Sequence, residues 1–494
     1  MTSDETGVVV PADASGRRSS SALGRAVVAD ALRSVDPVGA AGAERETNWR
    51  SGYLVHFRRL VEAGVTSRHA AVTVATDGLQ SVHRQMQYRR ADGDDRPLDA
   101  AVHDTAGSVL STVEIAGAGQ PEETFSLPLR GQRLSGDALA RQLDTWAELG
   151  VLEPSAVERV QTVMAHPQWL RLDGQTVVVL GAGAEMGPLS ALLRWGARVA
   201  AIDLPRPDVW RRVQATGRDR AGTLLVPVDG ELVNPADPDA VAARAGLDLL
   251  TDVAAAAQWI RGFDGPIVLG NYVYADGVIN LRLAAAVDAL TVSLQSARPD
   301  LALAFLATPT DVFAVPPDAV TQALQAYDTR PRLARVLGRP LRTLSGGRLL
   351  RRHYVPGVQP GICDALVAQQ GPNYALAKRL QRWRATVARE AGTTVSMNVA
   401  PPTRTRSVLK NRALAAAYAG AHRFGVEVFE PATANTLMAA LLVADLNTDG
   451  GPPHEQPWQD EAYAAVHGGL WRAPYQPRSA LGLAAVLGYA AART

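Results

Sequence analysis

The sequence predicts an α/β protein in which a doubly wound parallel sheet follows a smaller, mixed but mainly helical domain. Two observations indicate this fold. Residues 174–205 show a buried apolar strand at 177–180, a glycine-rich turn, a helix and a second strand that ends at Asp203. Further apolar runs follow at the intervals of alternating strands and helices, which favours a parallel sheet with its ligand over the carboxyl ends of the strands.

The length of 494 residues suits more than one domain. Residues 1–45 are predicted to be a flexible tail, because they are polar or rich in alanine and glycine. Residues 46–170 combine helical periodicity with two alternating strands and are expected to form a separate cap or accessory domain. Residues 171–494 would contain the sheet, with a long insert at 311–370 before the helix that begins near residue 372.

Composition narrows the classes of partner and compartment. The chain carries 50 Lys and Arg against 49 Asp and Glu, a net charge of +1, so we expect neither a nucleic-acid partner nor attraction to an anionic membrane. It has no secretory signal pattern and no unbroken apolar run long enough to span a membrane. One cysteine, Cys363, excludes an internal disulfide and favours a cytoplasmic protein. No metal site is predicted, because the histidines between residues 56 and 103 lack zinc-site spacing.

The turn after the first strand of the sheet has the residues that a dinucleotide needs. Gly181 and Gly183 permit a tight turn and close approach of the backbone, and Gly187 lets the following helix pack near the strand. The N-terminus of that helix would face the pyrophosphate. Asp203, about 20 residues further on, is placed to accept hydrogen bonds from a ribose. The acid predicts NAD, and NADP stays open because arginines lie nearby.

A tyrosine and a lysine on a later helix indicate proton transfer. The chain has only two lysines, Lys378 and Lys410, and Tyr374 stands four positions before the first. This spacing places Tyr374 and Lys378 on one helical face. A nearby cation stabilises a phenolate and lowers the tyrosine pKa from about 10. Tyr374 could then exchange a proton with an alcohol or a carbonyl while hydride passes to or from a nicotinamide.

Residues 174 to about 450 resemble a divergent short-chain dehydrogenase/reductase. The motifs match in order, although Leu180 and Ala184 depart from the family's usual threonine and glycine. The matching positions are the turn at 180–187 with Met186, the adenine-contacting acid Asp229, the loop LGNY with Asn271, the helix asparagine Asn280, the pair Tyr374 and Lys378, and the nicotinamide-closing loop with Pro401 and Thr403.

The resemblance implies a Rossmann-like fold and an NAD(P)-dependent reduction of a carbonyl or oxidation of an alcohol. Tyr374 would be the general acid or base, Lys378 would also hold the nicotinamide ribose, and Asn280 would support the lysine through water. The resemblance also implies a homo-oligomer. The extra N-terminal domain and the 311–370 insert would shape the pocket for a small-molecule substrate, with a bulky one left open.

The family's catalytic serine has no direct counterpart. The segment FLATPT offers Thr308 or Thr310, and we assign the role to Thr308, with Ser345 of the insert as the alternative. This departure keeps a second hypothesis open, in which the protein binds nucleotide without redox turnover or uses bound NAD in an epimerase or lyase reaction.

Overall fold

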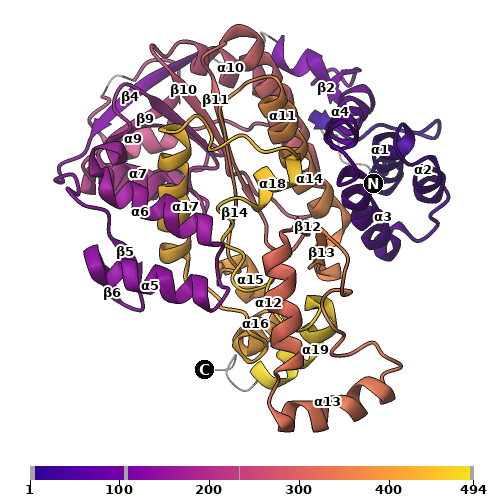
Figure 1. Ribbon diagram of the computed structural model, residues 1–494. Helices are drawn as coiled ribbons and strands as arrows, with labels where there is room; N and C mark the ends of the chain where they lie inside the picture. The colour runs from indigo at the N-terminus through magenta and orange to yellow at the C-terminus, as the bar shows by residue number, and fades with distance from the viewer. Residues whose placement is uncertain (1–5, 105–108, 233, 490–494) are drawn as a thin grey trace.

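The computed structural model describes residues 6–104, 109–232 and 234–489, and its centre is a seven-stranded sheet flanked by helices (Figure 1). Across the sheet the order is β14-β11-β10-β7-β8-β9-β4. The strands are β4 (Leu110–Ala116), β7 (Thr176–Leu180), β8 (Arg198–Ile202), β9 (Thr223–Asp229), β10 (Ile267–Asn271), β11 (Ala302–Ala307) and β14 (Val395–Val399).

Six of these strands are parallel, and only β4 runs antiparallel, at the edge beside β9. The first of the parallel strands in sequence, β7, lies in the middle, with β8 and β9 on one side and β10, β11 and β14 on the other. The order in which successive strands are added to the sheet therefore reverses between β7 and β10. In folds of this kind a ligand binds in the crevice at that point. The predicted α/β class with a mostly parallel sheet is confirmed, and its strand order is compatible with a Rossmann-like fold.

The two faces of the sheet have separate apolar cores. Because side chains alternate along a strand, Val178 and Leu180 of β7 point into one core while Val177 and Val179 point into the other. The first core includes α10 (Val253–Arg261), α11 (Gly277–Ala297) and α14 (Gly371–Glu390). The second includes α6 (Pro154–Ala165), α7 (Leu189–Trp195), α8 (Pro207–Asp219), α9 (Pro238–Arg244) and α17 (Pro431–Leu446).

The predicted flexible tail is wrong for residues 20–44. They form α1 (Ser20–Arg33) and α2 (Pro37–Glu44), which join α3 (Trp49–Gly64) and α4 (Arg68–Gln85) at one side of the molecule (Figure 1). The Ser19 side chain caps α1, and Val27, Val28 and Leu32 are fully buried. An apolar stripe at helical spacing therefore orders this segment, although its overall composition is polar and rich in small residues.

The expected separate domain at 46–170 is also wrong. Its strand β4 belongs to the main sheet, and α6 packs against α17 in the second core. Helices α3 and α4 share the first core with α14, so both ends of this segment are continuous with the sheet domain. The other elements of the N-terminal third are β1 (Gly7–Val9), β2 (Gln87–Arg89), β3 (Asp95–Pro97), η1 (Leu98–Val102), β5 (Leu127–Leu129), β6 (Gln132–Leu134), α5 (Gly136–Glu148) and η2 (Pro167–Arg171).

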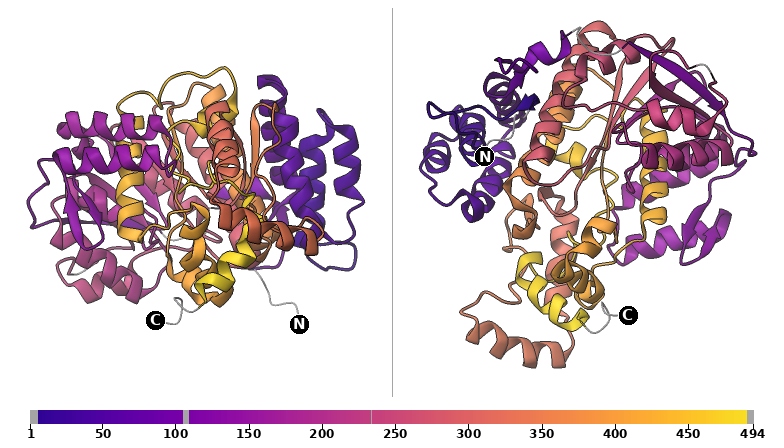
Figure 2. Two further views of the ribbon diagram at one scale, coloured as in Figure 1. Left: turned by 60° about the horizontal axis from the view of Figure 1, so that its bottom comes forward. Right: turned by 180° about the vertical axis from the view of Figure 1, so that it is seen from behind.

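The 311–370 insert folds into a short antiparallel pair of strands with two helices between them. It contains β12 (Val312–Val315), α12 (Pro317–Asp328), α13 (Arg332–Leu344), β13 (Gly361–Asp364) and η3 (Ala368–Gln370). Helix α13 is the lowest element and stands apart from the body in Figure 1 and in the right-hand view of Figure 2. The C-terminal part adds α15 (Arg406–Lys410), α16 (Arg412–Gly420), η4 (Ala421–Phe424), α18 (Pro457–Ala462) and α19 (Pro477–Gly488).

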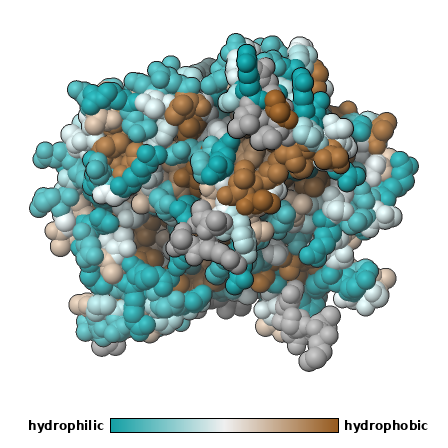
Figure 3. Space-filling view, turned by 90° about the horizontal axis from the view of Figure 1, so that it is seen from below, coloured by the Kyte–Doolittle hydropathy of each residue, from teal (hydrophilic) through white to brown (hydrophobic). Residues whose placement is uncertain are grey.

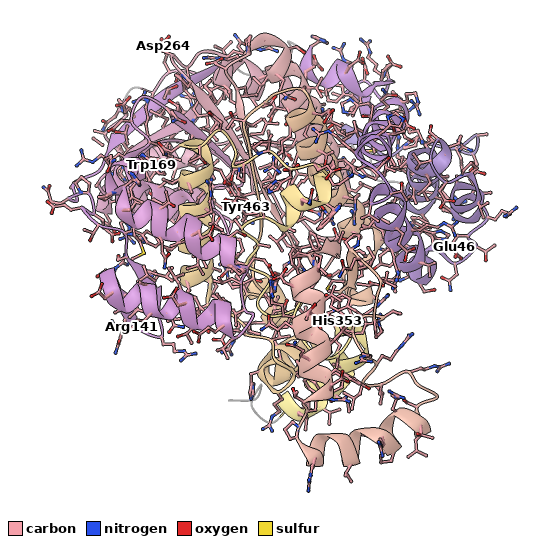
Figure 4. The ribbon with its side chains drawn as sticks, in the orientation of Figure 1. Glu46, Arg141, Trp169, Asp264, His353 and Tyr463 are labelled. Atoms are coloured by element: carbon pink, nitrogen blue, oxygen red, sulfur yellow. The ribbon has the colours of Figure 1, made fainter. Side chains whose placement is uncertain are left out.

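A buried histidine helps to hold the insert on the body. His353, labelled in Figure 4 beside α12, donates from Nδ1 to the carbonyl of Ala473 at 3.0 Å and stacks on Tyr354. The Tyr354 hydroxyl donates to the carbonyl of Trp471 at 2.7 Å. These bonds tie the end of the insert to the segment before α19.

Among the described helices, α11 alone is long and apolar enough to cross a membrane. In the structure 67% of its apolar window is buried between the sheet and its neighbours. Its composition therefore reflects a core helix.

Candidate functional site

The candidate site lies at the carboxyl ends of the parallel strands, where β11 meets the first turns of α14. Thr308 follows the last residue of β11, and Tyr374 stands in the first turn of α14. The Thr308 side chain lies close enough to the phenol of Tyr374 to lower its pKa. The fold thus brings together two residues that are 66 positions apart (374 minus 308) and that the sequence analysis assigned to one reaction.

A chain of hydroxyl groups continues from this pair. Oγ1 of Thr308 lies 2.9 Å from Oγ1 of Thr310, and Nε2 of Gln370 donates to the Thr310 oxygen at 2.9 Å. Ser345, the alternative from the insert, lies at the end of α13 and donates to the carbonyl of Arg342 at 3.0 Å. Thr308 lies beside Tyr374, and Thr310 shares a hydrogen bond with Thr308. Ser345 instead bonds to a residue of the insert.

Aromatic rings surround Tyr374. The ring of Tyr274 lies 6.2 Å away in an edge-to-face arrangement, and its hydroxyl donates to Asp276 at 2.8 Å. Tyr418 of α16 lies close enough to Tyr374 for that phenol to help raise the pKa of Tyr418. Burial raises the pKa of Tyr374, and the nearby Thr308 side chain opposes this only in part. The predicted lowering of this pKa is therefore wrong for the protein without nucleotide.

Lys378 lies one helical turn after Tyr374 and contacts β11. Its Nζ donates to Oε1 of Gln381 at 3.1 Å and to the carbonyl of Leu306 at 3.5 Å. Burial lowers the lysine pKa to about 8, against the opposing charge of Asp311. Lys378 therefore stands beside the strand end that carries Thr308, with an ammonium group that loses its proton near neutral pH.

Asp311 fixes the position of α14, and the sequence analysis missed it. Its carboxylate is 1% exposed and accepts from Nη2 of Arg379 at 2.8 Å and from Nη1 of Arg382 at 2.7 Å. Arg382 also binds Glu461, with Nε to Oε1 at 2.6 Å. Asp311 comes three residues after Thr308, and its two arginine partners lie on the same helix as Tyr374. These bonds therefore hold Thr308 and Tyr374 in position relative to each other. The sequence features that could have revealed this contact are the aspartate in TPTD and the two arginines three positions apart, Arg379 and Arg382.

The glycine turn is tight and has an acidic side chain beside it. Gly181 has φ +83°, and a side chain there would lie 2.9 Å from the carbonyl of Tyr272. The backbone N–H of Gly183 donates to Oδ2 of Asp203 at 2.7 Å, and that of Leu204 donates to Oδ1 at 2.8 Å. The predicted acid thus lies beside the exposed turn, and these residues fit the adenosine half of NAD.

The helix after the turn differs from the expectation. Gly187 is buried, but α7 begins only at Leu189 and has seven residues. We therefore assign no phosphate site to its N-terminus. The turn's own backbone, with half-buried Met186 at its end, would have to approach a pyrophosphate.

The proline and threonine loop after β14 reaches across to this turn. Glu185 accepts from Nε of Arg406 at 2.9 Å and from the backbone N–H of Arg406 at 2.8 Å. Within the loop, Oγ1 of Thr403 donates to the carbonyl of Pro401 at 2.8 Å. The segment from β14 to α15 thus connects the strand at one edge of the sheet with the central turn. Glu185 places an acidic side chain in a turn that was expected to face phosphate.

The remaining predicted residues lie at strand ends or helix starts. Asn271 ends β10, and its buried Oδ1 has no hydrogen-bond partner among the described residues. Asp229 is exposed at the end of β9. Asn280 is buried in the first turn of α11 and accepts from the backbone N–H of Ala275 at 3.0 Å. Asn280 therefore orders the loop after β10, and its link to Lys378 stays a prediction.

A small apolar cavity adjoins the hydroxyl chain. Its volume is about 70 Å³, and it lies among α16, η4, α19 and the loops beside them. Thr310 and Tyr418 reach it from the side of Tyr374, and Arg478 is its one charged lining residue among those described. The apolar lining includes Ala365, Pro402, Phe424, Val428, Leu470 and Leu481.

The arrangement can bind an oxygen and move a proton beside an apolar cavity. Two hydroxyl groups converge at Thr308 and Tyr374, and the lysine and the nucleotide-type turn lie at the same edge of the sheet. Neither the protein-family models nor the curated proteins compared with this chain gave a match.

Proposed function

We propose that the protein is an NAD(P)-dependent oxidoreductase that interconverts a carbonyl and an alcohol. The observation that carries the proposal is the closeness of the Thr308 hydroxyl to the phenol of Tyr374 at the carboxyl end of β11. It is supported by Asp203, which lies beside the glycine turn, where the ribose of a dinucleotide would be held. A bound nicotinamide would supply or accept the hydride.

The residues of the chain would handle the oxygen and the proton. Thr308 would hydrogen-bond the substrate oxygen, and Tyr374 would give it a proton or take one from it. Thr310 and Gln370 hold the Thr308 hydroxyl in place. Because burial raises the pKa of Tyr374, the phenol keeps its proton at neutral pH. This property favours reduction of a carbonyl, in which the phenol donates.

The cavity supports a substrate with a short apolar group beside its carbonyl. A cavity of roughly 150 Å³ lined by apolar side chains holds a benzene ring. The space beside Thr310, about 70 Å³, suits a short alkyl group. The bulky substrate that the sequence left open gains no support from this cavity. We also propose NAD over NADP because of Asp203, and a cytoplasmic location, while the homo-oligomer stays an expectation.

The test is a fluorescence titration with NADH and NADPH, followed by assays on short aliphatic aldehydes and ketones. We expect NADH to bind the wild type and Tyr374→Phe equally, and turnover to fall by about 10²–10⁴-fold in the variant. Thr308→Val should lower turnover by about 10²-fold or more. Thr310→Val is the matched control and should cost less than about 10-fold. Absence of binding by either nucleotide would overturn the proposal.

One observation favours the second candidate, a nucleotide-binding protein without redox turnover. Glu185 brings a carboxylate into the glycine turn, where it is paired with Arg406. Nucleotide binding without any turnover that depends on Tyr374 would support this candidate.

A further inference from the structure

The segment 329–352 concentrates positive charge in a chain that is nearly neutral overall. Its charged residues are all basic, and the segment has no aspartate or glutamate. This charge is confined to one segment, so the net charge of +1 for the whole chain conceals it. The eight arginines are Arg330, Arg332, Arg335, Arg339, Arg342, Arg348, Arg351 and Arg352.

Helix α13 exposes apolar side chains together with this charge. Leu344 is 87% exposed, Val336 65% and Leu341 40%. Large apolar side chains this exposed on a helix that stands apart from the body indicate a contact surface (Figure 1). An amphipathic helix with arginines on its polar side is typical of segments that lie on a membrane surface.

Among the arginines of this segment whose side chains the structure describes, few bind a polar partner and only Arg352 pairs with a carboxylate. Arg352 pairs with Asp328 at 2.6 Å, and Nη1 of Arg342 donates to the hydroxyl of Tyr327 at 2.9 Å. Arg332, Arg339 and Arg348 are exposed, and none has a carboxylate partner among the described residues. These three guanidinium groups are therefore free to bind anions.

The end of α19 extends the same face. Leu350 and Arg351, after α13, bind Ser479 in the first turn of α19 through backbone N–H groups, at 3.2 and 3.0 Å. Further along α19, Val486 is 72% exposed and Leu487 50%. Figure 3, which views the molecule from below, shows hydrophobic residues gathered on this side among hydrophilic ones.

We propose that α13 and the exposed end of α19 dock on an anionic lipid membrane. The arginines would bind lipid phosphates while Leu344, Val336 and Val486 enter the boundary of the acyl chains. A second copy of this face is disfavoured as the occupant, because each copy carries the same positive charge. Since Ala480 and Ala484 of α19 line the cavity, docking would bring one wall of the candidate site beside the bilayer.

The test is flotation of the full-length protein with vesicles. Phosphatidylcholine vesicles with about 30% phosphatidylglycerol should carry the wild type, and pure phosphatidylcholine vesicles should carry at least about 10-fold less. Salt at about 0.5 M should weaken the binding, because it screens the arginines. Arg332→Glu with Arg339→Glu, and separately Leu344→Asp, should each lower binding by about 10-fold or more.

The matched control reverses two exposed arginines elsewhere, Arg50→Glu on α3 with Arg171→Glu at the end of η2, and should bind as the wild type does. Circular dichroism and thermal unfolding check that every variant is folded. Equal binding by the α13 variants and the control would overturn the proposal, as would absence of binding to anionic vesicles. A dimer that Leu344→Asp dissociates, without vesicle binding, would assign the face to a second copy instead. Loss of NADH binding alone would not affect this inference.

Discussion

Helices α13 and α14 are both rich in arginine, but the protein surrounds them differently. In α14, Arg379 and Arg382 are buried against Asp311, and Arg384 binds Asp288 with both Nε and Nη2 at 2.7 Å. In α13, Arg332 and Arg339 are exposed and have no carboxylate partner in the described part of the chain. The same residue type therefore fixes a helix in the core in one place and leaves a charged surface in the other.

Carboxylate partners decide whether the arginines of these two helices are buried or exposed. A buried guanidinium group needs a partner, because an isolated buried charge is costly. Asp288 and Asp311 come from α11 and from the segment after β11, so α14 can enter the core only where those elements meet. No acidic residue occurs in segment 329–352, and α13 lies outside the body.

The largest expected effect is on stability when Asp311 is removed. Asp311→Ala would leave buried Arg379 without its carboxylate partner and Arg382 with Glu461 alone, and should lower the free energy of unfolding by about 3–5 kcal/mol. Asp328→Ala removes the exposed partner of Arg352 and should cost less than about 1 kcal/mol. Urea denaturation of both variants measures the difference. Similar losses in the two variants would break the distinction between the helices.

Acid should reveal the buried pairs of α14. Burial acts to raise the pKa of Asp288, but Arg384 and His83 outweigh it and hold that pKa well below its usual range. The carboxylate therefore contributes stability above its unfolded pKa of about 4 and loses it as pH falls through the folded value. Between pH values of about 5 and 2, wild type should lose roughly 2–3 kcal/mol more than Asp288→Asn. Thermal unfolding across this range provides the measurement, and parallel pH profiles would contradict the assignment.

Lys378 is the exception on α14, because it is buried without a carboxylate contact among the described residues. Burial lowers its pKa to about 8, so the unfolded chain binds more protons between that pH and about 10.5. Stability should therefore rise with pH across this window in wild type. Lys378→Met should remove the slope and stabilise the protein at pH 7 by about 1–3 kcal/mol, while turnover falls. Lys410→Met, at the exposed second lysine, is the control and should keep the slope.

The smallest expected effect concerns the arginines of α13. Arg332→Gln with Arg339→Gln should change the free energy of unfolding by less than about 0.5 kcal/mol, since both side chains are exposed. Chemical denaturation checks this value against Arg379→Gln with Arg382→Gln, which should destabilise strongly. A loss above about 1 kcal/mol in the α13 variant would show that this helix also depends on its arginines for folding.

The local sequence was sufficient where neighbouring residues decide the conformation. The apolar run at 177–180, the turn at Gly181 and the acid at Asp203 predicted β7, the tight turn and the end of β8. The spacing of Tyr374 and Lys378 predicted that they share a helix. Thr308 was assigned to the same reaction through the family resemblance, because it follows the apolar strand at which the family's serine stands, and the structure places it near Tyr374.

Only the tertiary structure decided what depends on residues far apart in the chain. Composition suggested a tail, but burial against α4 and α14 orders α1, and pairing with β9 brings β4 into the sheet. The pKa of Tyr374 also depends on residues far away in the chain. A lysine four residues away predicted a lowered value, whereas burial among elements from distant parts of the sequence raises it. Periodicity and turn residues are local properties, but burial and charge pairing depend on which distant elements the fold brings together.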